Sequence, residues 1–237
     1  MWLQHATRAL IPAGRWFFRG SRVLGGERVP REGPLIAVFN HASFLDPWFA
    51  GMLLPRLPIR YLITEEWYRR SRLWTAFFAG YGTIPTSGRR PAETILGVVE
   101  ALSRGDFIGL FPEGRISHDG RMNRVRHGIG WMAAFSGAPV LPCALRGNYE
   151  ALPRQRRRPR RHPVVLVIGE PLRFPGGPAD RPTPRDVHAF TREVAAAIAR
   201  LAGQERRLPE ILPEREPRDI VPLLERAREA HRARPAP

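Results

Sequence analysis

A short apolar run that ends in a polar tract is the feature that most constrains the fold of this chain. Residues 35–39 (LIAVF) carry no polar side chain, and residues 40–46 (NHASFLD) follow them directly. A short continuous apolar run of this kind is typical of a buried strand. His41 then lies at the C-terminal end of a strand, which is where open α/β sheets place their ligand sites.

A second polar tract has the same position relative to an apolar run. Residues 111–117 (FPEGRIS) directly follow the apolar residues 107–110 (FIGL). Loops at the C-terminal ends of two parallel strands can converge on one cleft. The first loop would contribute a base with its orienting acid, and the second a cation and a carboxylate.

The first tract also has a purely structural explanation. Asp46 followed by Pro47 fits the start of a helix, with Asp at the N-cap and Pro at the first helical position. Ser43 and Asp46 have the spacing of a capping box. A single histidine beside a cap is more often structural than catalytic, so His41 and Asp46 alone leave this alternative open.

Taken together, the tracts resemble sequence blocks of the glycerolipid acyltransferase family, which includes the 1-acylglycerol-3-phosphate acyltransferases. The first block of that family, Asn-His-x-Ser-x-x-Asp, is matched by Asn40, His41, Ser43 and Asp46. In the family this block carries the general base and its acid. The resemblance therefore implies those catalytic roles for His41 and Asp46.

The other blocks match less completely. The third block, usually Phe-Pro-Glu-Gly-Thr-Arg-Ser, has Arg115 and Ile116 in place of Thr-Arg, a variant similar to that of the bacterial 2-acylglycerophosphoethanolamine acyltransferases. Residues 82–85 (GTIP) match the start of the second block, and residues 140–142 (VLP) resemble the fourth. Four blocks in the family order over residues 35–145 form a stronger signal than any one of them.

The resemblance implies an O-acyltransferase of phospholipid biosynthesis, which moves a fatty acyl group from acyl-CoA or acyl-ACP to a hydroxyl of a lysophospholipid or glycerol phosphate. A histidine can accept a hydroxyl proton near neutral pH, and a carboxylate can fix its tautomer. No protein nucleophile is needed if the alcohol attacks the thioester directly. The chain has no Gly-x-Ser-x-Gly motif, and its one cysteine, Cys143, lies in an apolar run that predicts burial.

Arginines are the candidates for binding the phosphate of the acceptor. In the family the third block holds the acceptor with its arginine, so the resemblance points to Arg115, one position earlier than usual. Its alternatives or partners are Arg89, Arg90, Arg124 and Arg126. Glu113 could accept an acceptor hydroxyl, fix the arginine or brace the loop, and Gly114 could allow close approach of substrate or a positive φ. We expect no metal and no resident cofactor, because the seven histidines are scattered.

The charge of the chain predicts an anionic partner. The net charge is +16, and all 38 basic residues are arginine. Phospholipid headgroups, acidic carrier protein and nucleic acid would all be attracted, although codon bias in a GC-rich genome explains the general preference for arginine.

A non-catalytic basic protein on membranes or nucleic acid is the alternative function, and it leaves the ordered blocks unexplained. A hydrolase, with water as acceptor, is a third interpretation. We expect an anionic membrane surface as partner and no nucleic acid.

The periodicity predicts an α/β fold with a mainly parallel central sheet flanked by helices. The strands are expected at residues 35–39, 59–64, 81–85, 107–111, 140–145 and 163–169, and the helices at 46–54, 65–80, 91–104, 127–136 and 185–201. We expect three parts: an amphipathic N-terminal segment (1–30), an acyltransferase domain (31–175), and a linker, amphipathic helix and charged tail (176–237). The tail from residue 204 onward is expected to be partly helical and poorly packed.

Three segments suggest contact with a membrane. Residues 1–25 mix aromatic residues with arginines at helical spacing, which fits an interfacial helix as well as a helix packed on the domain. Residues 65–80 are unusually aromatic; a core position explains most of these rings, and the others could line an acyl groove or contact lipid. The arginine run at 154–161 could bind anionic lipid, acyl carrier protein or nucleic acid, although a charge run of this kind is usually a solvated loop. No signal peptide or membrane span is predicted, which suggests a peripheral protein on the cytoplasmic face of the membrane.

Overall fold

A seven-stranded sheet forms the centre of the molecule, and its strands run in the order β1-β8-β7-β2-β5-β3-β4. In this computed structural model, residues 2–176, 182–206 and 208–212 are described, together with residues 222, 225, 226 and 229. The strands of the sheet are β1 (Arg22–Leu24), β2 (Leu35–Phe39), β3 (Arg60–Thr64), β4 (Ile84–Thr86), β5 (Phe107–Leu110), β7 (Val140–Arg146) and β8 (Val165–Ile168). Neighbouring strands pair in parallel except β7 and β8, which are antiparallel. The predicted mainly parallel sheet is thus confirmed.

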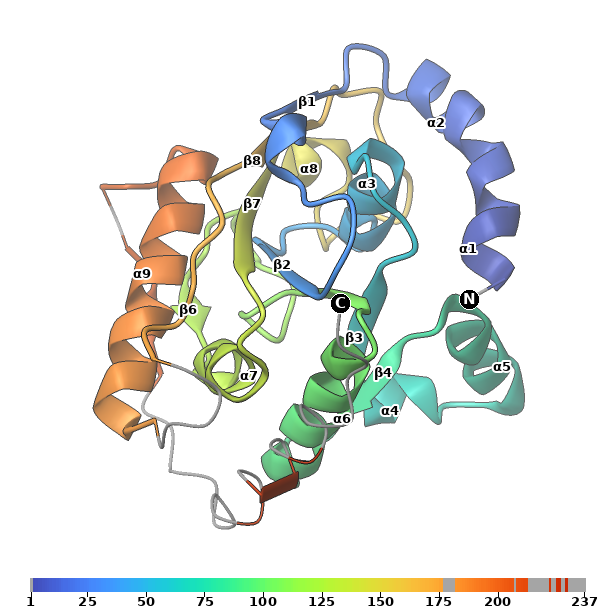
Figure 1. Cartoon of the computed structure of the whole chain (residues 1–237). Coiled ribbons are helices and arrows are strands. Elements are labelled where there is room, and N and C mark those ends of the chain that lie inside the picture. Colours follow the sequence, from blue (N-terminus) through green and yellow to red (C-terminus); the bar gives the residue numbers. More distant parts are fainter. Residues whose placement is uncertain are drawn as a thin grey trace.

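Helices cover both faces of this sheet (Figure 1). The described helices are α1 (Trp2–Thr7), α2 (Ile11–Phe17), α3 (Asp46–Leu53), α4 (Glu65–Tyr68), α5 (Arg72–Tyr81), α6 (Pro91–Ser103), α7 (Gly128–Ser136), α8 (Asn148–Ala151) and α9 (Pro184–Ala202). Along β2, Ile36 and Val38 pack with α6, α7 and α9, whereas Leu35, Ala37 and Phe39 pack with α3. A strand with side chains in two cores must be apolar at every position, which explains the unbroken run at residues 35–39.

Two segments differ from what the sequence predicted. The helix expected at 65–80 is divided into α4 and α5, because Ser71 is extended and its side chain caps α5 by accepting from the N–H of Trp74. Residues 118–126 before α7, where no strand was expected, contain the short strand β6 (Arg124–Val125), which pairs with β9 (Glu210–Ile211). The start of the charged tail is therefore tied to the domain, since strand pairing satisfies its backbone groups.

The N-terminal segment combines helical and extended structure. Helices α1 and α2 are joined by a 3₁₀ turn, η1 (Arg8–Leu10), and a second 3₁₀ turn, η2 (Gly26–Arg28), follows β1. Strand β1 joins the sheet beside β8, and Phe18, just after α2, packs against Phe49 of α3. Within the described part of the chain, no helix has the length and apolar character needed to cross a membrane.

Candidate active site

The parallel pairing of β2 with β5 brings the two polar tracts to one edge of the sheet. The register places Val38 opposite Leu110, so both loops leave their strands at the same level. The backbone N–H of His41 donates to Oε1 of Glu113 over 2.8 Å, and the carbonyl of His41 accepts from the N–H of Ser117 over 2.7 Å. The sequence tracts therefore form one connected structure.

His41 and Asp46 form a hydrogen-bonded pair. Nδ1 of His41 lies 2.9 Å from Oδ2 of Asp46, whose side chain is fully buried. The histidine ring stacks on Phe111 with a centroid distance of 4.1 Å and is 16% exposed. Because an ionised carboxylate can only accept, the neutral ring carries its proton on Nδ1 and has a free lone pair on Nε2. No described side chain or backbone group bonds Nε2, so this nitrogen can accept a proton from a substrate.

The carboxylate of Asp46 is held by four donors. Oδ2 accepts from the backbone N–H groups of Ala42 at 2.7 Å and Ser43 at 2.8 Å, besides Nδ1 of His41. Oδ1 accepts from Nδ2 of Asn148 at 2.8 Å. Every one of these contacts stabilises the ionised form, which explains how a charge is kept without exposure to water.

The helix-start explanation of this tract is correct only in part. Helix α3 begins at Asp46, but its N-cap is Leu45, and no side chain caps the helix. Of the capping box, the bond from Ser43 N–H to the Asp46 carboxylate is present, whereas the Ser43 hydroxyl accepts from the N–H of Leu45. The carboxylate faces back into the loop, where it fixes the loop and His41 together.

Glu113 is a buried acid that braces the first loop from the second. It is 4% exposed, and its contact with the His41 backbone matches the bracing role left open by the sequence. Burial raises the pKa of Glu113 to about 8, and the nearby charge of Asp46 adds to this rise, while the hydrogen bond from His41 N–H opposes it. Near neutral pH Glu113 is therefore mostly protonated.

The candidate arginines are not all brought together. Arg115 is exposed on the second loop. The side chain of Arg126 lies beside Gly114 of the same loop, because a Cβ added at Gly114 would come within 3.1 Å of Nε of Arg126. The φ angle of Gly114 is 66°, as the sequence had suggested. The backbone N–H of Arg126 also donates to the carbonyl of Pro112. Arg124 is half-buried in β6. Arg115 thus belongs to the loop that carries Glu113, and Arg126 lies beside this loop.

Arg89 and Arg90 lie elsewhere on the same edge, beyond β3 and β4. Arg90 pairs with Glu93 at 2.9 Å and with Glu65 at 3.4 Å, so its charge is largely used within the protein. Arg89 is exposed and precedes α6. Arg89 and Arg90, which follow the partly matched second block, therefore lie near β4, two strands away from β5 in the sheet.

Sequence reasoning missed Asn148, the buried residue that bonds Asp46. It lies just past β7, the parallel neighbour of β2, and is 3% exposed. Asn40 makes a similar connection, because its side chain accepts from the N–H of Leu145 at 2.8 Å and donates to the carbonyl of the same residue at 3.0 Å. A polar residue directly after the strand next to β2 was the available signal for Asn148.

In the described part of the chain, neither a reactive thiol nor a group of metal ligands accompanies the His41 pair. Cys143 is buried, and burial raises the pKa of its thiol. Among the described residues, no three His, Cys, Asp or Glu side chains lie close enough together to hold a metal ion. The chemistry that the site offers is acid–base chemistry at Nε2 of His41.

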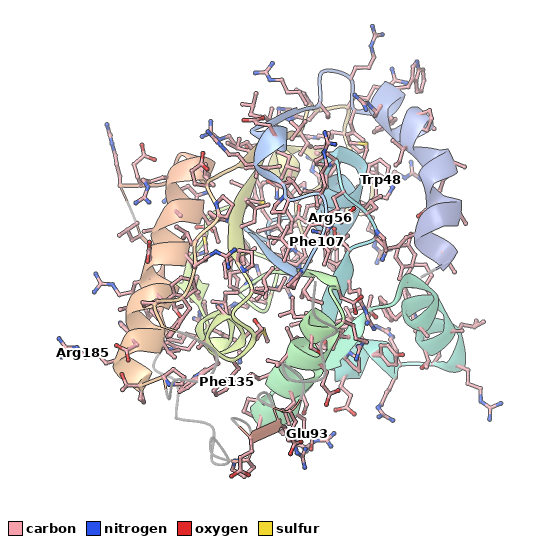
Figure 2. All side chains as sticks on the ribbon, in the orientation of Figure 1. Trp48, Arg56, Glu93, Phe107, Phe135 and Arg185 are labelled. Atoms are coloured by element: carbon pink, nitrogen blue, oxygen red, sulfur yellow. The ribbon has the colours of Figure 1, made fainter. Side chains whose placement is uncertain are left out.

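A cavity of about 310 Å³ lies at the opposite edge of the sheet, where β2, β5 and β3 begin. Figure 2 labels Arg56 and Phe107, which line it; the guanidinium lies 5.1 Å from the ring centroid. Arg56 also donates to the carbonyls of Pro30 and Gly33. Arg56 therefore ties the segment before β2 to the start of the sheet, and the length of the strands separates it from His41.

Comparisons with known proteins agree with this fold. The chain is 27% identical over 160 residues to the chloroplastic 1-acyl-sn-glycerol-3-phosphate acyltransferase BAT2 of Brassica napus, covering 64% of this chain and 44% of that protein. It is 29% identical over 164 residues to an uncharacterized protein of Mycobacterium bovis, covering 63% of this chain and 44% of the relative. The chain thus spans less than half the length of these relatives.

A solved structure shares the fold over most of the chain. The crystal structure of the 1-acyl-sn-glycerophosphate (LPA) acyltransferase PlsC from Thermotoga maritima superposes with a TM-score of 0.63 and 23% identity, covering 87% of this chain and 81% of that one. The Acyltransferase family model matches residues 20–146, a span that holds both polar tracts. This match covers more than half of the sequence, and the chain belongs to the acyltransferase family.

Proposed function

We propose that the chain is an O-acyltransferase in which His41 is the general base. Nε2 takes the proton from the acceptor hydroxyl as its oxygen attacks the thioester carbonyl of acyl-CoA or acyl-ACP. The carbon–sulfur bond then breaks, and the thiolate takes the proton back from the imidazolium. The observation that supports this proposal is the 2.9 Å contact between His41 Nδ1 and the fully buried Asp46, which leaves Nε2 without a partner among the described residues.

Asp46 and Asn148 position this base. Asp46 fixes the tautomer that leaves Nε2 unprotonated and stabilises the imidazolium that forms during the reaction. Asn148 donates to the other carboxylate oxygen, so it favours the ionised form of Asp46 and fixes its plane. Glu113 holds the backbone of His41 from the second loop, which sets the distance between the base and the acceptor site.

The acceptor that fits is a lysophospholipid or glycerol phosphate. Relatives of this chain are named 1-acyl-sn-glycerol-3-phosphate acyltransferases, and Arg115 and Arg126 lie beside the Glu113 loop. Guanidinium groups bind phosphate oxygens in a bidentate manner, so these two are the proposed phosphate ligands. The protein would work as a peripheral enzyme on the cytoplasmic face of an anionic membrane, with residues 31–175 as its acyltransferase domain.

An acyl-transfer assay tests the proposal. Purified protein is given labelled acyl-CoA or acyl-ACP with glycerol 3-phosphate or one of several lysolipids, and His41→Ala is compared with His162→Ala. We expect His41→Ala to lose about 10²–10⁴-fold in activity, the usual contribution of a general base, and His162→Ala to keep it. Full activity in folded His41→Ala would contradict the mechanism. Acyl-donor cleavage that is equally fast without an acceptor would identify a hydrolase instead.

A further inference from the structure

Helix α5 presents its large apolar side chains to solvent. Gly80 is the buried residue of this helix, whereas Leu73 is 84% exposed, Trp74 40% and Phe77 41%. Trp67 of the adjoining helix α4 is 41% exposed. A helix that packs on a core turns such side chains inward, so the core explanation for this aromatic segment is wrong for these rings. We call Trp67, Leu73, Trp74 and Phe77 the aromatic face.

The rings of the aromatic face support one another rather than a core. Trp74 meets Trp67 and Phe77 edge to face, with centroid distances of 6.2 Å and 5.7 Å, and stacks on Phe78 at 5.4 Å. The helix pair lies outside β4, the edge strand, with α1 beside α5 (Figure 1). Exposed apolar surface that is gathered in one place marks a contact with another apolar phase.

Arginines surround the aromatic face. The guanidinium of Arg70 lies 4.8 Å from the ring centroid of Trp67, and Arg69 and Arg72 are also exposed. Arg69 pairs with Glu65 at 2.8 Å, while Arg72 forms no ion pair with a described residue. Tryptophan rings flanked by arginine side chains suit the headgroup level of a bilayer, where rings enter the apolar boundary and cations meet lipid phosphates. The net charge of +16 favours the same anionic partner.

The aromatic face also begins at the catalytic edge of the sheet, where Trp67 lies on helix α4. Helix α4 starts directly after β3, and β3 runs parallel to β5, whose end leads to Glu113. From this placement, and from the exposed apolar side chains with arginines around them, we infer that the aromatic face docks the chain on an anionic bilayer. Its link to catalysis rests on the proposed function, because a lysolipid acceptor would then reach His41 from the bilayer that the face contacts.

Vesicle binding by the full chain tests this inference without any reaction. Co-sedimentation is measured with vesicles of phosphatidylcholine alone and of phosphatidylcholine with phosphatidylglycerol. We expect the unchanged protein to bind the anionic vesicles. The affinity of Leu73→Glu for these vesicles should be lower by about tenfold or more, and that of the double variant Leu73→Glu/Phe77→Glu lower still. Leu208→Glu is the matched control, because Leu208 is 53% exposed near β9 and should bind like the unchanged protein.

A second pair of changes separates the aromatic face from the N-terminal helices. Leu10 and Trp16 are 57% and 61% exposed, so Leu10→Glu/Trp16→Glu removes comparable apolar surface there. Loss of binding in that variant, with Leu73→Glu binding normally, overturns the inference. Equal loss in Leu208→Glu overturns it too. The inference is also overturned if the protein does not bind vesicles and instead forms a dimer that dissociates in the Leu73→Glu variant.

Activity toward two forms of acceptor keeps the two proposals apart. A short-chain lysolipid below its critical micelle concentration needs no bilayer, so Leu73→Glu should turn it over normally and lose activity toward acceptor held in anionic vesicles. Vesicle binding that needs Leu73 in a protein without any transferase activity supports the docking surface and rejects the proposed function. If Leu73→Glu reduces turnover of the soluble acceptor as much as turnover of the acceptor in vesicles, the docking role is contradicted, because the substitution would then act on the site itself.

Discussion

The loop around His41 and helix α4 lie at the same edge of the sheet, but the loop and the helix pair α4–α5 are stabilised in opposite ways. In the loop, polar groups are buried and paired: Asp46 is 0%, Asn148 3% and Glu113 4% exposed. In the helix pair, large apolar groups remain exposed, with Leu73 at 84%. The polar groups of the first region find their partners within the chain, whereas the exposed apolar surface of the second is not covered by any of the described residues.

This difference indicates a division of work. A buried polar network specifies one geometry, because any displaced donor or acceptor loses its partner in a medium without water. An exposed apolar surface carries no such constraint and can adapt to a fluid partner. Substitutions in the loop should therefore affect chemistry and folding strongly, and substitutions on the aromatic face should affect neither in solution.

The largest effect is expected from Asp46→Asn. An amide has one acceptor oxygen where the carboxylate has two, so it cannot satisfy the four donors or hold the required tautomer of His41. We expect kcat/KM to fall about 10⁴-fold, the effect of the corresponding change in a Ser-His-Asp triad. Asp106→Asn is the control, since Asp106 pairs with Arg60 at the opposite edge. Comparable activity in the two variants would contradict the role of Asp46.

Glu113→Gln tests the buried acid through the pH dependence of stability. The pKa of Glu113 is raised to about 8, so the folded protein binds a proton that the unfolded chain releases near pH 4.5. The contribution of Glu113 to stability is thus fully present below pH 4.5 and is lost as the pH rises through 8. Glutamine keeps an acceptor for His41 N–H, so the variant should become more stable than the unchanged protein at pH 9, by a few kcal/mol at most. Urea unfolding at pH 5 and pH 9 gives the free energy of unfolding of both proteins. A difference between the two proteins that is the same at both pH values would show that Glu113 stays ionised.

Asn148→Ala should have a smaller effect with a characteristic pH dependence. It removes one donor from the ionised Asp46 and leaves three, so the chain should fold. A hydrogen bond to a charged group contributes about 1.5–3 kcal/mol, and we expect the acidic limb of the pH–rate profile to move to higher pH by about one unit. Asn123→Ala, which removes a bond to Asp119 in the same region, serves as control. A loss of activity that is equal at every pH would mean that Asn148 has a structural role alone.

The sequence predicted the parts of the site that short-range patterns encode. The apolar run before Asn40 and the run before Phe111 specify two buried strands, and their parallel pairing follows from the alternation of strands and helices. The contacts of Asn148 could not be predicted, because it lies 102 residues from Asp46 and no local pattern records their approach. The exposed position of Trp74 was also missed, since an apolar helical stripe has the same sequence whether a core or another partner covers it.

The smallest effect is expected from Leu73→Ala in the absence of membranes. Leu73 contributes little buried area to the folded chain, so the free energy of unfolding should change by no more than about 0.5 kcal/mol. Phe49→Ala is the contrasting change, because Phe49 is fully buried against Phe18 and should cost about 3–5 kcal/mol. Urea unfolding of both variants measures the difference. A loss above about 1 kcal/mol in Leu73→Ala would show that α5 packs within the chain, and the contrast between a loop with paired polar groups and a helix pair with exposed apolar groups would no longer hold.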